Sequence, residues 1–264
     1  MTENNLQGNP QGVSLASGVR EGDQALSSRK KFLAGSAALL AGGALAAVLP
    51  GAARAHTTGN PPTDVDVLNF ALTLEHLEYA FYRDGLRKFD EQDFRSSNLF
   101  SGSGNLWRPT VYQNFVRIRE HEETHVDTLK SVIGSLGGTP VPEAEYNFRR
   151  TAFTSVEKFV AVAQFLENTG VSAYDGAIAH IQRAQLLTAG ATIATVEARH
   201  ASYLNLLNGD VPFPRAFDEP AAPRAICEAV QAENGGFIVS APRPYGPYRS
   251  LDALCMRLPN TTTP

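Results

Sequence analysis

Apolar residues recur along four stretches of the chain at alternating spacings of three and four positions, the pattern of a helix with one buried face. The stretches predict helices over about residues 64–86, 109–136, 155–187 and 191–207. Gly137 and Gly138 are expected to end the second helix, and Asn208 and Gly209 to end the fourth. One short further helix is expected around 222–233, and no strand-like alternation competes with this pattern. The predicted fold class is therefore all-α.

Two of these helices carry a Glu-x-x-His tetrad within their apolar face. The tetrads are Glu122 to His125 in the second helix and Glu197 to His200 in the fourth. Residues three apart share one face of a helix, so each tetrad aims a carboxylate and an imidazole at one point. A surface pair that stabilises a helix turn is the alternative for a single tetrad. Two tetrads, both in the apolar stripe, favour a buried site whose polar groups need a partner.

The first and third helices carry a second matching pattern. Glu75 and Tyr82 are seven positions apart, as are Glu167 and Tyr174, so each tyrosine shares a helix face with its glutamate. The order Glu-x6-Tyr and then Glu-x-x-His therefore occurs twice, which indicates duplication of a helix pair. The tyrosines are expected to hydrogen-bond the carboxylates or to carry electrons, and ordinary buried tyrosines are the alternative.

The connection between the second and third helices, residues 139–151, contains two prolines and shows no helical period. Its extended length, at about 3.3 Å per residue, reaches about 50 Å. The second helix, at a rise of about 1.5 Å per residue, is about 40 Å long. The connection can therefore run the length of a four-helix bundle as a crossover.

At this point the chain resembles a known group of proteins. One glutamate from each of two helices and a Glu-x-x-His from each of two others is the ligand set of ferritin-like, carboxylate-bridged dimetal proteins. More narrowly, residues 68–75 (LNFALTLE) and the Gly- and Pro-containing linker from 137 to 148 resemble the ferritin-like domain of desiccation-related and stress-response proteins. The resemblance covers about residues 64–209. It implies a ferritin-like four-helix bundle with a long crossover and six metal ligands, which are Glu75, Glu122, His125, Glu167, Glu197 and His200.

The charge of these residues indicates metal independently of the resemblance. Four carboxylates meeting in an apolar core carry a charge of about −4, and an unpaired buried charge costs several kcal/mol. Two divalent cations neutralise four glutamates, while the two histidines bind as neutral imidazoles. Glutamate and histidine ligands without cysteine suit iron or manganese better than a structural zinc site. The alternative is a metal-free core in which some glutamates are protonated.

Other polar residues near the tetrads are weaker candidates. Glu78 lies one turn from Glu75 and can replace it or add a further ligand. Glu75 is preferred because only it has a tyrosine seven positions later. His76 and His121 each neighbour a predicted ligand, and we expect them at the surface or behind the ligands. Glu123 is expected on the solvated face of its helix.

The chain is expected to have three parts: an export signal with its leader, a bundle and a C-terminal extension that packs on the bundle, over residues 1–55, 56–209 and 210–264. The basic residues Arg29 to Lys31 precede a Gly/Ala/Leu run over 32–49 and an Ala-x-Ala site at 53–55. The Arg-Lys-x-Phe-Leu order resembles a twin-arginine signal. Lys30 replaces the second arginine, so the general secretory route stays open, and a retained membrane anchor is the alternative to a signal. The mature protein is expected in the periplasm or outside the cell without a stable membrane anchor.

Composition bears on the partners and on the cysteines. The net charge is −4 at pH 7, and no basic cluster is interleaved with aromatic residues, so nucleic acid is not an expected partner. Cys227 and Cys255 both lie in the C-terminal part. In an oxidising compartment they can form one disulfide, and two buried thiols are the alternative.

Three functions fit these observations. The first is an exported dimetal oxidoreductase that acts on hydrogen peroxide or dioxygen under oxidative or desiccation stress, as a monomer or a homo-oligomer. Two manganese ions favour peroxide disproportionation, whereas two iron ions favour oxidation with oxygen or peroxide. The second is a module that sequesters iron without useful turnover. The third is a non-catalytic stress protein in which the metal is structural.

Overall fold

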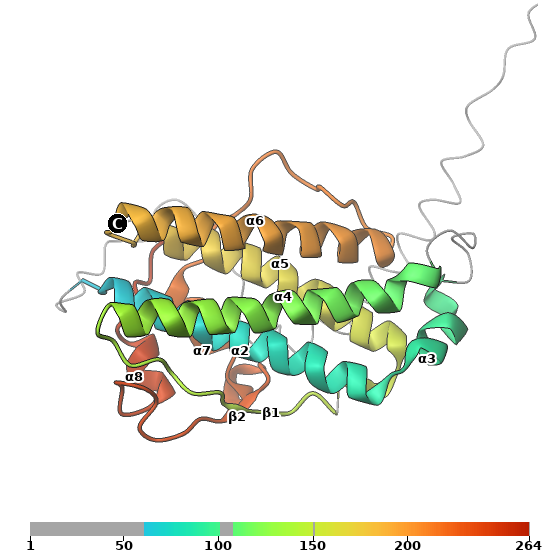
Figure 1. Cartoon of the computed structure of the whole chain (residues 1–264), viewed down its shortest axis with the longest axis horizontal. Helices are drawn as coiled ribbons and strands as arrows, with labels where there is room; N and C mark the ends of the chain where they lie inside the picture. The colour runs from blue at the N-terminus through green and yellow to red at the C-terminus, as the bar shows by residue number, and fades with distance from the viewer. Residues whose placement is uncertain (1–60, 101–107, 150, 264) are drawn as a thin grey trace, which may run out of the picture.

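The computed structural model describes residues 61–100, 108–149 and 151–263, so the expected export signal over 1–55 lies outside the described residues. Four long helices lie side by side as a bundle (Figure 1) and confirm the predicted all-α, four-helix architecture. They are α2 (Asp64–Lys88), α4 (Arg108–Ser135), α5 (Val156–Ile178) and α6 (Ala184–Leu207). The linker after α4 runs back along the outside of the bundle before α5 begins, so α4 and α5 point in the same direction (Figure 1). This is the predicted crossover.

The first helix begins at a reciprocal capping interaction. The Thr63 hydroxyl accepts a hydrogen bond from the Asp66 amide at 3.2 Å, and the Asp66 carboxylate accepts one from the Thr63 amide at 2.8 Å. Arg87 and Lys88 in the last turn complement the negative end of the helix dipole. The sequence therefore defines both ends of α2 locally, within two residues of the prediction.

The turn between α5 and α6 differs from the prediction, which continued the third helix to 187 and began the fourth at 191. Instead, α5 ends at Ile178 and α6 begins at Ala184. The Gln182 amide donates to Asp64 Oδ1 at 2.7 Å, and Arg183 Nη1 lies 3.3 Å from Asp64 Oδ2. A buried carboxylate from α2 thus fixes this turn. The turn contains no glycine or proline that could mark it in the sequence.

Two short helices lie between α2 and α4, where the apolar pattern predicted none. They are α3 (Glu91–Ser96) and the short 3₁₀ helix η1 (Asn98–Phe100). Asp90 caps α3 by accepting hydrogen bonds from the amides of Gln92 and Asp93. The capping signal was present in the sequence, but α3 is too short to show a helical period.

Short strands and helices follow the crossover and α6. In the crossover, β1 (Glu145–Tyr146) pairs antiparallel with β2 (Ile238–Ser240) from the C-terminal segment, although no strand was predicted. Strands of two and three residues that come from distant parts of the sequence are too short to show an alternating apolar pattern. The helix expected over 222–233 ends earlier than predicted. The remaining elements are η2 (Ala152–Thr154), α7 (Pro223–Ala229), η3 (Ala232–Asn234) and α8 (Leu251–Cys255).

The C-terminal segment packs against the first helix through buried polar contacts. Tyr245 donates to Thr73 Oγ1 at 3.1 Å, and Tyr248 donates to Asp66 Oδ1 at 2.9 Å. Cys227 and Cys255 form a disulfide that joins α7 to α8, which settles the alternative left open by the sequence. Across the part of the chain that the structure describes, no helix combines the length and apolar character needed to cross a bilayer.

Two different kinds of core lie on either side of the bundle's middle. Toward the end of α2, aromatic rings pack together, including Phe81 stacked on Phe159 with ring centroids 4.9 Å apart. A Cβ on Gly85 would lie 2.2 Å from the ring of Phe159, so this position must remain glycine for the ring to fit. Toward the start of α2 the core mixes aliphatic side chains such as Leu68 and Ile193 with the buried ring of Phe70.

Candidate metal centre

The six predicted ligands come from all four long helices and meet in the middle of the bundle. Two groups form, each with three carboxylates and one imidazole whose ligand atoms lie within 4.8 Å of one another. The groups are Glu75, Glu122, Glu197 and His125, and Glu122, Glu167, Glu197 and His200. Two glutamates thus belong to both groups. All four glutamate residues are 0% exposed, so the groups lie in the protein interior.

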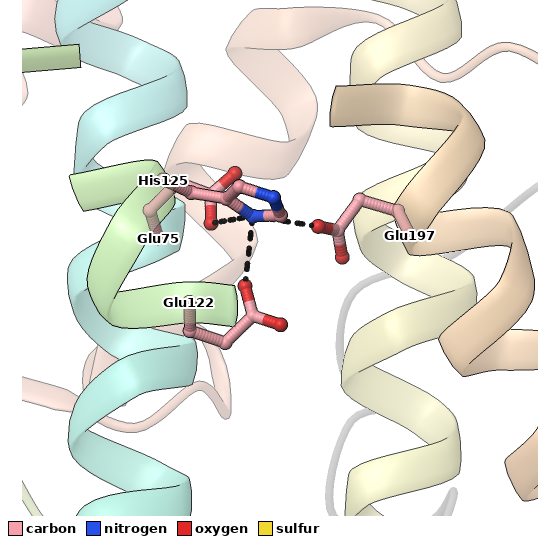
Figure 2. Close-up of side chains that lie close together, drawn as sticks. All are labelled: Glu75, Glu122, His125 and Glu197. Carbon is pink, nitrogen blue, oxygen red and sulfur yellow. Dashed lines mark hydrogen bonds and ion pairs between the residues drawn. The ribbon is translucent and has the colours of Figure 1, made fainter. Parts of the chain in front are cut away.

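His125 is the centre of the first group (Figure 2). Its Nδ1 lies 3.2 Å from Glu75 Oε2, 3.2 Å from Glu122 Oε2 and 3.1 Å from Glu197 Oε1. One N–H cannot donate well to three carboxylates at once. Two ligands about 2.1 Å from a single ion, at a right angle, lie about 3.0 Å apart. The separations around His125 therefore match neighbouring ligands of one metal ion.

His200 repeats this arrangement in the second group. Its Nδ1 lies 3.0 Å from Glu122 Oε1 and 3.1 Å from Glu167 Oε2. Its other ring nitrogen, Nε2, lies 2.9 Å from His121 Nδ1, and the two rings stack. If Nδ1 held a metal ion, Nε2 would carry the proton and donate a hydrogen bond to His121 Nδ1, which would fix the orientation of the His200 ring. His121 therefore lies behind a ligand, one of the two places expected for it.

Several carboxylate oxygens in the two groups accept no well-aligned hydrogen bond, although imidazole nitrogens lie close to two of them. They are Glu122 Oε1 and both side-chain oxygens of Glu197, and all three are buried. A buried acceptor without a donor costs about 1–3 kcal/mol, and more when it is charged. A cation between the oxygens removes that cost. The residues present therefore fit a metal site, with the two shared glutamates positioned to bridge.

The comparisons with known proteins agree with this geometry. A family model described as the ferritin-like domain matches residues 63–210. The chain belongs to the ferritin-like family. It is also 25% identical over 187 residues to the protein rds1 of Schizosaccharomyces pombe (strain 972 / ATCC 24843). That similarity covers 70% of this chain and 42% of rds1, so the chain spans less than half the length of this relative. Both findings support the resemblance to ferritin-like stress-response proteins.

In the ferritin-like centre, burial and the close approach of the glutamates shift the pKa values of several candidate ligands. Burial, together with the charge of Glu197, raises the pKa of Glu75 from 4.5 to about 8. Burial also raises the pKa of Glu167 well above its usual value. Burial alone would raise the pKa of Glu197. The hydrogen bonds from His125 and His200 have the larger combined effect and lower this pKa to about 2. Burial alone would lower the pKa of His125, but its carboxylate neighbours raise it. Protonated imidazoles and protonated carboxyl groups thus reduce the negative charge of the cluster, which metal ions can also neutralise.

The two tyrosines singled out in the sequence, Tyr82 and Tyr174, bond carboxylates, but not those of their own helices. Tyr82 on α2 donates to Glu167 Oε1 on α5 at 2.6 Å, and Tyr174 on α5 donates to Glu75 Oε1 on α2. Both rings are buried. The spacing predicted which face each tyrosine occupies, and the packing of α2 against α5 exchanges their partners. A role in electron transfer stays a prediction.

Two residues near Glu75 had alternative places in the sequence analysis, and both are buried. His76 was expected at the surface or behind the ligands, and at 2% exposure it does not lie at the surface. Burial lowers the pKa of His76 to about 4, so its ring is neutral at pH 7. Glu78, the weaker alternative to Glu75, is also buried at 3% exposure. Both glutamates therefore line the interior, whereas Glu123 lies on the exposed face and accepts a hydrogen bond from Tyr79, as expected of a solvated position.

An apolar cavity of about 40 Å³ is lined in part by Tyr174, which bonds Glu75. Its lining includes Ala71, Leu129 and Ile193. Ala71 and Ile193 each precede a predicted ligand by four residues, and Leu129 follows one by four. One helical turn is about 5.4 Å, so the cavity lies about one turn from the centre on three helices at once.

Proposed function

We propose that the protein is an exported, ferritin-like dimetal oxidoreductase that acts on dioxygen or peroxide under oxidative or desiccation stress. The observation that supports this most strongly is the pair of four-residue groups that share two glutamates. Glu75 and His125 would hold one ion, and Glu167 and His200 the other, with Glu122 and Glu197 between them. The ions are iron or manganese, because glutamate and imidazole ligands suit these metals.

Two redox-active ions side by side supply the electron pair needed to cleave an O–O bond. The chain's own residues prepare the site for this chemistry. Tyr82 and Tyr174 hold Glu167 and Glu75 in place through hydrogen bonds. His121 holds the His200 ring from behind. Burial of all four glutamates keeps bulk water away from them.

The cavity favours dioxygen over peroxide as the substrate. It is lined by apolar side chains apart from Thr128 and the ring of Tyr174, whose hydroxyl is already bonded to Glu75. Water and hydrogen peroxide need polar partners to enter such a space, whereas a small apolar molecule does not. A volume of about 40 Å³ is small compared with the roughly 150 Å³ of a cavity that binds benzene, so only a very small molecule would fit.

The test is to remove metal with a chelator, reload the protein separately with Fe²⁺ or Mn²⁺, and follow oxygen with an electrode. The iron-loaded protein is expected to consume dioxygen with a suitable reductant present. Oxygen release from peroxide by the manganese-loaded protein would instead assign peroxide disproportionation. Glu122→Gln should abolish either activity, and Glu123→Gln should retain it. A protein that binds two ions and performs neither reaction would leave the alternative, a non-catalytic metal-binding or structural stress protein.

Export is a separate part of the proposal. A disulfide such as Cys227–Cys255 is typical of oxidising compartments outside the cytoplasm. The basic, apolar and Ala-x-Ala segments before residue 56 favour a cleaved signal. Changing Arg29 to Lys should block export if the twin-arginine route is used. Undiminished export of the variant would assign the general secretory route, and retention of the parent in the cytoplasm would contradict export.

A further inference from the structure

The internal duplication places Gly170 of α5 at the position equivalent to Glu78 of α2. Each lies three residues after the glutamate of its own helix, which is Glu75 in α2 and Glu167 in α5. Residues three apart share a helix face, so both positions face the metal centre. One half of the duplicated bundle therefore offers a carboxylate where the other offers no side chain.

These two equivalent positions are in contact. A Cβ added to Gly170 would lie 3.1 Å from Glu78 Oε1 and 3.7 Å from Glu197 Oε2. The first of these distances is tighter than almost all real Cβ contacts, so the Glu78 carboxylate occupies the space that the missing side chain leaves. Glycine in the middle of a helix costs about 1 kcal/mol relative to alanine, which is consistent with a role for that space.

Glu78 has no local structural reason to be buried. It is 3% exposed, and its Oε2 receives no hydrogen bond. An unpaired buried carboxylate is strongly unfavourable, so one that points into a cluster of other carboxylates calls for a cation. Burial is the main cause that raises the pKa of Glu78, and the charges of Glu197 and Glu167 add more to it than Glu75 does. Carboxylates of both ligand groups therefore act on Glu78.

We propose that Glu78 is a fifth carboxylate ligand of the centre and that it binds the ion on the side of Glu167 and His200. Its place on α2 supports this, because it lies between Glu75 of the first group and Tyr82, whose hydroxyl bonds Glu167. The inference rests on the proposed dimetal centre. Its consequence is that the two ions are not equivalent, since the second is held by one more negative charge and binds more tightly.

The test is a titration of the metal-depleted, full-length protein with Mn²⁺ and, separately, with Co²⁺. The parent is expected to bind two ions with different affinities. Glu78→Gln should weaken the tighter ion by at least about tenfold and leave the other near its parent affinity. Glu123→Gln, an exposed change of the same chemistry on α4, should leave both affinities unchanged.

A second variant keeps every charge. Gly170→Ala adds a methyl group against Glu78 Oε1 and should weaken the same ion as Glu78→Gln does. The double variant should be no weaker than Glu78→Gln, because both changes remove one interaction. The d–d absorption of bound Co²⁺ should also intensify in Glu78→Gln, as a ligand is lost. If the parent binds two ions and both variants match it, Glu78 is not a ligand and the dimetal function stands. If the parent binds no ions, this inference and the dimetal function both fail.

Discussion

The two halves of the candidate metal centre come from helix pairs that repeat the same residues. In α2 and α4 they are Glu75, Tyr82 and the tetrad ending at His125, and α5 and α6 carry the same set. The halves interlock, because each tyrosine bonds the glutamate of the opposite half. Each helix pair therefore supplies a hydrogen bond that orients a carboxylate of the other pair.

The halves differ in what surrounds the ligands. Glu78 faces Gly170 across the centre. His121 holds His200, whereas the residue equivalent to His121, before the second tetrad, is Val196. Aromatic rings pack around Tyr82, and the apolar cavity lies beside Tyr174. The comparison shows that the two halves share the same set of candidate ligands but surround them with different side chains.

The largest effect is expected from Glu122→Gln, because this residue belongs to both groups. Both ions should bind more weakly. A stabilisation of about 4 kcal/mol, which a ligand at about a thousand times its Kd provides, should be mostly lost. In chelator the variant should be as stable as the parent or more stable, since one of several repelling charges is gone. Melting curves with and without Mn²⁺ or Fe²⁺ measure this.

The control for that comparison is Glu123→Gln, which lies on the exposed face and should change little in either condition. If Glu122→Gln melts higher than the parent in excess metal, the metal site is wrong and only the bundle remains.

The chelated protein should lose stability as the pH rises from about 4.5 to about 8. Across this window the folded chain keeps the Glu75 proton, whose pKa is raised from 4.5 to about 8, while the unfolded chain has released it. More protons bound in the folded state means that the free energy of unfolding falls with pH. Metal should reverse the slope, because binding needs ionised carboxylates and neutral imidazoles. Equal slopes of melting temperature against pH with chelator and with Mn²⁺ would contradict this.

Replacing Tyr82 or Tyr174 with phenylalanine should affect one half of the centre at a time. Tyr82→Phe removes the donor to Glu167, and Tyr174→Phe removes the donor to Glu75. Each change should weaken one ion by about tenfold, and the two variants should affect different ions. Metal titrations of both variants check the crossed pairing. Weakening of the same ion by both would show that the tyrosines do not act through separate carboxylates.

The smallest effect is expected from His121→Phe. Phenylalanine keeps a ring that can stack on His200 but removes the acceptor for Nε2–H. The ion held by His200 should bind several-fold to about tenfold more weakly, and the ion held by His125 should be unaffected. A titration in which both ions weaken equally would indicate a general packing defect.

Features that follow from the helical period could be predicted from the sequence. The apolar stripes located the four long helices, and the two repeated patterns located all six residues that now meet in the two groups. The end of α5 could not be predicted, because it is fixed by Asp64, a residue more than a hundred positions away. For the same reason the pairing of β1 with β2 was missed.

Several contacts at the centre also could not be predicted from the sequence, for physical reasons. A seven-residue spacing says which face Tyr82 occupies, but not that its partner is Glu167 on another helix. Glu75 and Glu78 share a face, so period alone could not show that both are buried in the cluster. The burial of His76 depends on how the rest of the chain covers α2. Only tertiary packing reveals these contacts.

The most direct test of the dimetal centre is anomalous X-ray diffraction from crystals grown with Mn²⁺. Two peaks are expected about 3.5–4 Å apart. One should lie beside Glu75 and His125 and the other beside Glu167 and His200, with Glu122 and Glu197 between them. A centre without anomalous density, in crystals saturated with Mn²⁺ at a pH above 7, would contradict the account.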